Sequence, residues 1–188
     1  KRNLNSGISE IKMVFYSDDQ TILRPFMNGN NNDPHPDEII INNVDVTSST
    51  RDSLKYKFPF GDNNVILKWH NVQLTTCIYM FYRIKEIKRI DFSNFDSSKI
   101  TDTSQMFFQC NGLEEINLNN FDTSAVEDMS KMFSGCNLIT SLDLSNFVTS
   151  KVKNMEDLFT YNYQLLKIDL SNIDTSSVET SIISDTNK

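Results

Sequence analysis

Hydrophobic and polar positions recur every 26 residues through the second half of the chain. Residues 116–141 read INLNNFDTSAVEDMSKMFSGCNLITS, and residues 90–115 and 142–167 align with them without insertion or deletion. A shorter fourth copy begins at Ile168. A phrase repeated at a fixed period is typical of arrays in which each unit buries its apolar side against its neighbours.

Each copy begins with a strand pattern in which two apolar residues flank one polar position. The apolar pairs are Ile90/Phe92, Ile116/Leu118, Leu142/Leu144 and Ile168/Leu170. Because stacking would set these segments side by side, we predict a parallel sheet. The asparagine that follows, Asn120 in the second copy, is predicted to point inward and to hydrogen-bond the backbone of an adjacent coil.

A short helix is predicted in the remainder of each copy. In residues 116–141 the apolar residues at three-to-four spacing are Val126, Met129, Met132 and Phe133. Residues 122–124 supply N-cap oxygens, and Gly135 is a plausible helix stop. A helix of about ten residues depends on packing against the strands.

The first 63 residues do not follow the repeat and read as strands separated by turns. Residues 11–16 and 65–69 have strand patterns, and Asn42-Asn43 between two apolar runs predicts a hairpin. Residues 64–89 align weakly with the repeat, since Met80-Phe81 precedes Met106-Phe107 by one period. We therefore predict a β-rich cap over residues 1–63 and coils over residues 64–89, 90–115, 116–141, 142–167 and 168–188.

The predicted fold class is an α/β solenoid: a leucine-rich-repeat-like array of short parallel strands and short helices, with an N-terminal antiparallel β cap. In the last copy, Ser181, Ser184 and Asp185 replace apolar residues of the other copies. This change predicts a polar cap that protects the open edge. The alternative is an edge completed by more protein or by a second molecule, stacked head-to-tail.

The phrase L-D-L-S-N-F-D-T-S-x-V-x-x-M-x-x-M-F-x-G-C resembles the 26-residue leucine-rich repeat of BspA-type surface proteins. That repeat, also called the mycoplasma lipoprotein-like repeat, occurs on bacterial and protist cell surfaces. Thr103, Val148 and Tyr161-Asn162 depart from the pattern. The resemblance implies surface exposure, adhesion or recognition, and no catalytic activity; it transfers no binding residues.

Composition narrows the classes of function. A net charge of −7, with scattered basic residues, argues against a nucleic-acid partner. No apolar run is long enough to cross a bilayer, so no membrane insertion by this segment is expected. His35 and His70 lack the spacing of metal ligands, and no nucleophile or phosphate-loop motif occurs. We therefore expect no enzyme activity, no metal and no cofactor.

Cys110 and Cys136 occupy the same position in neighbouring copies. Stacking would place them at strand spacing with parallel Cβ vectors, an arrangement too wide for the Cβ separation of a disulfide. Two buried thiols are the preferred interpretation, with a disulfide as the alternative.

The polar positions beside each strand core form a predicted partner-binding face, called the predicted face below. Its members are Arg89, Asp91, Ser93, Asn117, Asn119, Asp143, Ser145, Lys167, Asp169 and Ser171. The functional hypothesis is a polar recognition surface or a weak cation site. The alternative is a solvated ladder with no partner, because such rows cost little in water.

These observations predict a non-enzymatic interaction or adhesion module at the cell surface or outside the cell. Its partner would be a protein or glycan of a cell surface or matrix, or copies of itself. The second hypothesis is a structural subunit that stacks head-to-tail into a surface filament or coat.

Overall fold

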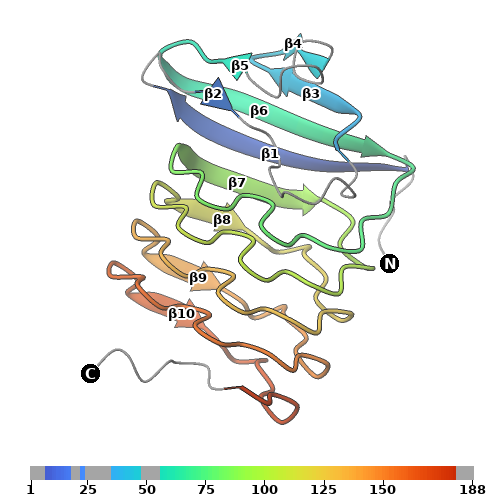
Figure 1. The fold of residues 1–188 in the computed structure, drawn as a ribbon, viewed down its shortest axis with the longest axis vertical. Helices are drawn as coiled ribbons and strands as arrows, with labels where there is room; N and C mark the ends of the chain where they lie inside the picture. The colour runs from blue at the N-terminus through green and yellow to red at the C-terminus, as the bar shows by residue number, and fades with distance from the viewer. Residues whose placement is uncertain (1–6, 18–21, 24–34, 48–55, 181–188) are drawn as a thin grey trace.

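The computed structural model describes residues 7–17, 22–23, 35–47 and 56–180. The N-terminal part contains β1 (Ile8–Ser17), β2 (Ile22–Leu23), β3 (Glu38–Ile41), β4 (Val44–Asp45), β5 (Tyr56–Lys57) and β6 (Gly61–His70). The repeats contain β7 (Ile87–Asn94), β8 (Glu115–Asn117), β9 (Ser141–Asp143) and β10 (Lys167–Asp169). Successive repeats form coils stacked along the long axis of the molecule, below the N-terminal strands (Figure 1).

One mixed sheet joins the N-terminal strands to the repeats, in the order β4-β3-β6-β1-β7-β8. All neighbours in it are antiparallel except β7 and β8. β1 therefore lies between β6 and β7, although it comes from the start of the chain. The strands β9 and β10 form a separate parallel pair.

The long strands β1 and β6 form because their residues alternate between the core and the outer face. Ile11, Met13 and Phe15 are buried, whereas Lys12 and Tyr16, on the other face of the strand, are exposed. This period of two is the pattern of a strand with one covered face. The strands predicted over residues 11–16 and 65–69 are confirmed.

The predicted hairpin is also confirmed. β3 and β4 pair antiparallel, and Asn42 and Asn43 between them have φ of 51° and 68°. Two consecutive positive φ values are characteristic of the tight turn that suits a twisted hairpin, and asparagine tolerates them. Residues 28–34 of a loop predicted over residues 28–37 lie outside the described residues, as do residues 54–55 of a strand predicted over residues 54–58.

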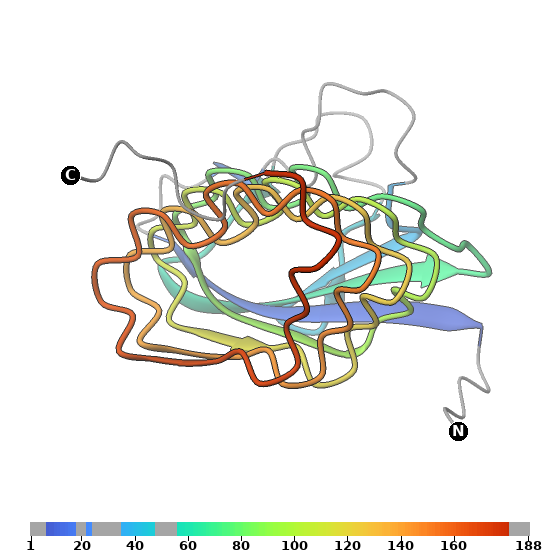
Figure 2. The same cartoon turned by 90° about the horizontal axis from the view of Figure 1, so that it is seen from below.

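The division at residues 63 and 64 falls within β6, so one strand crosses the expected domain boundary. The coil of residues 64–89 is aligned with the next coil, because the N–H of Cys77 donates to the carbonyl of Asp102 at 2.9 Å. Viewed from below, the coils overlie one another (Figure 2). The division of the chain into domains stays a prediction.

The predicted α/β solenoid of parallel strands and short helices is wrong. Thr47 is the only residue of the described part that is assigned to a helix. The main sheet is mixed and largely antiparallel, so the chain is a mostly β protein. Over residues 126–133, which were expected to be helical, the chain instead forms a β-bridge at Asp128 and then successive turns from Ser130.

Backbone dihedral angles exclude a helix in this segment. Gln105 and Gln109 have φ of 54° and 55°, and their counterparts one period later, Lys131 and Gly135, have 56° and 78°. An α-helix needs φ near −63° at every position. A residue with positive φ at every fourth position gives turns whose inward side chains keep a spacing of three and four, like that of a helix.

Alternate N–H groups in these turns point to different partners. The N–H of Phe107 donates to the carbonyl of Met132 in the next coil at 2.9 Å. The N–H of Met106 instead closes a turn onto the carbonyl of Thr103 at 3.1 Å. The same donation to the next coil occurs at Tyr79, Phe81, Arg83, Gln105, Gln109, Lys131, Phe133 and Gly135. The turns are therefore bonded coil to coil, as the strands of a sheet are.

The core between the strands and the turns contains columns of equivalent side chains. Phe107 stacks on Phe81 and on Phe133, with ring centroids 5.6 and 5.5 Å apart. Cys110 and Cys136 are buried free thiols, which confirms the preferred interpretation of this pair. The Cys110 thiol donates to the carbonyl of Phe81 at 2.9 Å.

Side chains complete the polar bonding of each coil. Asp91, Asp96 and Asp102 each accept a hydrogen bond from the N–H two residues later. These Asx turns form corners of the coil. Asn120 donates to the carbonyl of Ser93 in the preceding coil at 2.9 Å, as predicted, but its side chain is exposed and not inward.

We expect Gly112→Ala to lower stability strongly. A Cβ at Gly112 would lie 2.0 Å from the backbone oxygen of Lys85, where the neighbouring coil cannot yield without moving its chain. Overpacking of this kind costs about 1–3 kcal/mol. Urea unfolding of the variant should show this loss, whereas exposed Asn111→Ala should change stability by less than about 0.5 kcal/mol. Equal midpoints for the two variants would contradict the close approach of the coils.

We expect Thr123→Val to destabilise the stack between the second and third copies. The buried Thr123 hydroxyl donates to the carbonyl of Val148 at 3.0 Å and accepts from its N–H at 2.8 Å. Valine fills the same space but leaves both backbone groups without this partner, at a cost of about 1–3 kcal/mol. Thermal unfolding of this variant and of the exposed Ser124→Ala control measures the difference; a stable Thr123→Val protein would exclude the bridging role.

Candidate functional site

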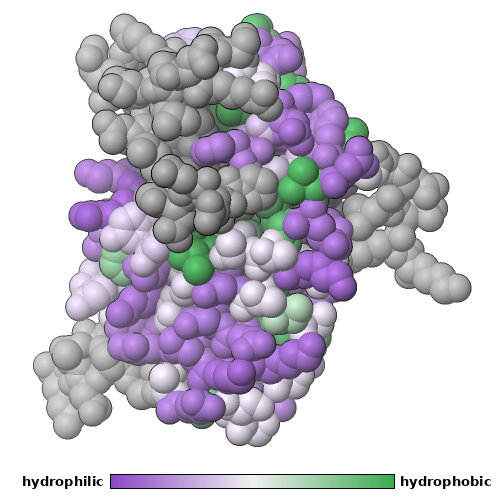
Figure 3. Space-filling view, turned by 45° about the vertical axis from the view of Figure 1, so that its right-hand side comes forward, coloured by the Kyte–Doolittle hydropathy of each residue, from purple (hydrophilic) through white to green (hydrophobic). Residues whose placement is uncertain are grey.

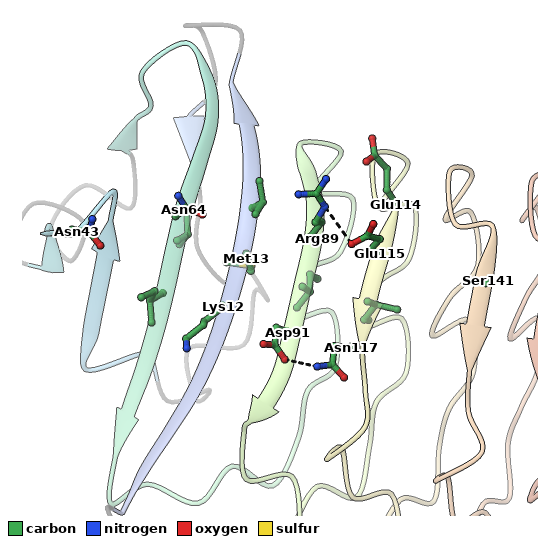
Figure 4. Close-up of a pocket in the computed structure, with 15 residues that line it drawn as sticks. Lys12, Met13, Asn43, Asn64, Arg89, Asp91, Glu114, Glu115, Asn117 and Ser141 are labelled. Carbon is green, nitrogen blue, oxygen red and sulfur yellow. Dashed lines mark hydrogen bonds and ion pairs between the residues drawn. The ribbon is translucent and has the colours of Figure 1, made fainter.

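A groove of about 720 Å³ lies on the outer face of the main sheet, across β6, β1, β7 and β8. The volume falls in the range of sites that bind small molecules or short segments of a partner. The groove lies where the N-terminal strands meet the first repeats, as the close-up shows (Figure 4).

Both charged and uncharged polar residues line the groove. The polar and charged residues are Lys12, Asn43, Asn64, Arg89, Asp91, Glu114, Glu115, Asn117 and Ser141. The apolar residues are Met13, Val14, Val65, Ile66, Ile90 and Ile116. The lining therefore combines amide donors and acceptors, both signs of charge and some apolar surface.

Cross-strand pairs order the charged side of the groove. Arg89 Nε lies 3.3 Å from a carboxylate oxygen of Glu115, and the side chains are 51% and 72% exposed. Beside them the amide of Asn117 donates to Asp91 at 2.9 Å. Both contacts link β7 to β8 (Figure 4). Because the ion pair is exposed, it costs little to replace by contacts with a partner.

Lys12 is the cation on the β1 side of the groove. Its register partner on β7 is Asp91, and its ammonium lies 3.2 Å from the carboxylate of Glu10. Val14 faces Arg89 in the same pair of strands. The lining of the groove thus contains two cations, Lys12 and Arg89, and three carboxylates, Asp91, Glu114 and Glu115, so its net charge is −1.

The structure divides the predicted face between the groove and the rest of the stack. Arg89, Asp91 and Asn117 line the groove. The other seven members do not line it: Ser93, Asn119, Asp143, Ser145, Lys167, Asp169 and Ser171. Ser93 lies near the end of β7 and Asn119 just after β8, and the remaining five lie in or after β9 and β10. Whether any of the ten binds a partner stays a prediction.

All three acidic members of the predicted face also have a structural contact. Asp143 accepts a hydrogen bond from the N–H of Ser145 at 3.0 Å, and Asp169 accepts one from the N–H of Ser171 at 2.9 Å. The hydroxyl and N–H of Ser145 lower the pKa of Asp143, and the N–H and then the hydroxyl of Ser171 lower the pKa of Asp169. These carboxylates hold the turns after β9 and β10 as anions.

Sequence reasoning missed the part of the groove that the N-terminal strands supply. Lys12, Asn64 and Ile66 reach the groove because β1 pairs with β7 on one side and with β6 on the other. The alternation within each strand indicated that these side chains face outward. Nothing in the local pattern indicated that β1 pairs with β7, about eighty residues away, with Glu10 opposite Asn94.

The described residues contain no group of three or more His, Cys, Asp or Glu side chains arranged to hold a metal ion. Burial raises the pKa of the Cys136 thiol to about 12 and also raises that of Cys110. Both thiols are therefore protonated at neutral pH and hydrogen-bond backbone carbonyls. Their burial and these hydrogen bonds explain both cysteines as residues of the core.

Among the described residues that the space-filling view shows, hydrophilic side chains cover most of the surface, with hydrophobic ones among them (Figure 3). Within the described part of the chain, no helix is long and apolar enough to span a membrane.

A comparison with known families gives one match. The model of a family described as "Mycoplasma protein of unknown function, DUF285" matches residues 60–185, about two thirds of the chain. The chain belongs to the DUF285 family. No curated protein and no solved structure matches it. The DUF285 match covers all the coils and β6, whereas β1 precedes it.

In this DUF285 protein we expect Ser145→Ala to raise the pKa of Asp143 towards its ordinary value. The Ser145 hydroxyl is the main cause of the lowered pKa, and the substitution removes it while leaving the N–H. Carboxyl-carbon NMR shifts followed against pH measure the change, with Asp174 as the internal control, because the N–H and hydroxyl of Ser176 lower its pKa and Asp143 does not act on it.

The direction of the linked stability change follows from the same pKa. Because the pKa of Asp143 is lower in the folded chain, its stabilising contribution is present above the unfolded pKa and lost as pH falls through the folded one. Ser145→Ala should therefore reduce the acid sensitivity of the turn after β9. An unchanged pKa of Asp143 would show that the hydroxyl does not act on it.

Proposed function

We propose that this chain is a non-enzymatic interaction module that binds a protein or glycan of a cell surface or matrix. The binding surface would be the groove on the outer face of the main sheet. The observation that carries the proposal is that three members of the predicted face, Arg89, Asp91 and Asn117, line the groove together with residues of β1 and β6.

The chemistry of the groove favours a polar partner with little net charge. Arg89 and Lys12 already have anionic neighbours, Glu115 and Glu10, so the groove does not need a charged partner to balance them. The side chains of Asn43 and Asn64 offer both donors and acceptors. A backbone segment or a sugar, each of which carries donors and acceptors close together, suits such a lining.

The location at the cell surface rests on resemblance. The repeat resembles that of BspA-type surface proteins, and the DUF285 match covers the repeats. An exposed rigid stack with a groove at one end would suit a protein that displays a binding surface. We propose an extracellular or cell-surface location on this ground.

We expect the double variant Lys12→Ala/Arg89→Ala to weaken binding about tenfold or more, as truncation of a central Arg commonly does. The probes are a glycan array and an immobilised extract of extracellular matrix, read by fluorescence of the labelled protein. Lys99→Ala/Lys151→Ala is the control, because it removes the same charge from exposed positions outside the groove.

Several outcomes would contradict the proposal. If both double variants bind as the original chain does, the groove is not the binding surface. If Asp143→Ala/Asp169→Ala weakens binding and the groove variant does not, the partner occupies the later coils. Absence of binding to both probes by the original chain would count against an adhesion role.

A further inference from the structure

The last coil presents a face that earlier coils bury. Leu170 is 43% exposed, whereas its counterparts Leu144 and Phe92 are fully buried. Ile168, Ile173 and Val178 are likewise only partly buried, although they pack against the core. The last coil thus has apolar residues at the core positions of the repeat, and the rest of the described chain covers them only in part.

The backbone at this end forms an open sheet edge. The N–H of Lys167 donates to the carbonyl of Thr140 at 3.1 Å, and the carbonyl of Asp169 accepts from the N–H of Leu144 at 3.2 Å. Groups on alternate residues of a strand point to opposite edges. The N–H and carbonyl of Ile168 therefore point away from β9, towards an edge where no described strand lies.

We propose that a second copy of this chain binds this edge, with the two β10 strands antiparallel about a two-fold axis at Ile168. In that register Ile168 and its copy exchange both of their hydrogen bonds, as directly opposite residues in an antiparallel pair do. The contact uses the same patch on both copies, so it closes at a dimer.

Charge complementarity supports this register. Lys167 of each copy comes opposite Asp169 of the other, giving two pairs of opposite charge on the outer face. Within one chain, β9 places Asp143 beside Asp169 and Ser141 beside Lys167. The antiparallel partner thus places an opposite charge beside Lys167 and beside Asp169, which β9 does not do.

An apolar pair extends the contact. The same register brings Leu166, just before β10, towards Leu170 of the other copy. Leu166 is 88% exposed, and the corresponding positions in the earlier coils are the polar residues Lys88, Glu114 and Thr140. In the proposed dimer the two leucines would cover each other, which adds buried apolar surface to the contact.

A further coil of the repeat, stacked on β10 in the parallel direction, gives no such matching. A further coil added parallel to β10, with the aspartate found at this position in most copies, would extend the row Asp143–Asp169 by a third like charge. The proposed dimer does not depend on the groove, which lies on β6, β1, β7 and β8. An experiment that contradicts the dimer would therefore not contradict the proposed function, and the reverse also holds.

Sedimentation equilibrium of the 188-residue chain tests the proposal, from about 1 μM to about 1 mM to cover moderate and weak affinities. We expect a monomer–dimer equilibrium. Lys167→Asp should weaken the dimer about tenfold or more, since it opposes two pairs of like charge. Asp169→Lys should do the same. The double variant Lys167→Asp/Asp169→Lys should restore dimerisation, because the pairs are re-formed with reversed signs.

Lys151→Asp is the matched control, since it makes the same change at an exposed position away from β10 and should leave the dimer intact. Circular dichroism checks that each variant folds, because Asp169 also holds the turn at Ser171. Asp169→Asn, which retains an acceptor for that turn, should weaken the dimer without reversing the charge.

A monomer throughout the concentration range would overturn the proposal. Assemblies that grow beyond a dimer would overturn it in favour of head-to-tail stacking. A double variant that stays as weak as the single variants, while folded, would exclude the antiparallel register.

Discussion

Hydrogen bonding between the backbones of successive coils is the constraint on which the structure depends. In the turns, the N–H of every second residue donates to a carbonyl 25 residues later, as from Phe107 to Met132, and the next N–H closes a turn. This alternation continues only if each coil has the same number of residues, because one insertion would exchange the two kinds of N–H. The unbroken 26-residue period is therefore a requirement of the backbone, and the repeated side chains follow from it.

The same constraint explains the polar residues within the repeat. Where a coil changes direction, some backbone groups cannot reach the neighbouring coil, and side chains bond them instead. Asp96 holds the N–H of Ser98, and the buried Thr123 bonds both backbone groups of Val148. At Val148 the usual aspartate is absent, yet its N–H keeps its partner in the preceding coil. Single departures from the phrase are tolerated because the bonds to adjacent coils remain.

The sequence allowed the period, the N-terminal strands, the Asn42-Asn43 hairpin and the buried thiols to be predicted, since each depends on local pattern or on spacing within the repeat. The helix was wrong because Met129, Met132 and Phe133 have the spacing of a helical face. Turns with positive φ at Lys131 and Gly135 give that spacing too. A positive φ at Lys131 could not be predicted, because lysine does not favour this conformation. The pairing of β1 with β7 could not be predicted, since no residue pattern in either strand indicates which strand it pairs with.

In the candidate site too, features that follow from the pattern within one strand could be predicted, and those that depend on the pairing of distant strands could not. Asp91 and Asn117 were predicted to face outward, and they do so beside the groove, but their mutual hydrogen bond also joins β7 to β8. The row of acidic residues is thus largely occupied by structural contacts. The groove differs from the rest of the face because β1 pairs with β7 there. This pairing places Lys12 opposite Asp91 and Val14 opposite Arg89. Repetition builds a uniform face, and the non-repeated strand gives one end of it a chemistry that the other coils lack.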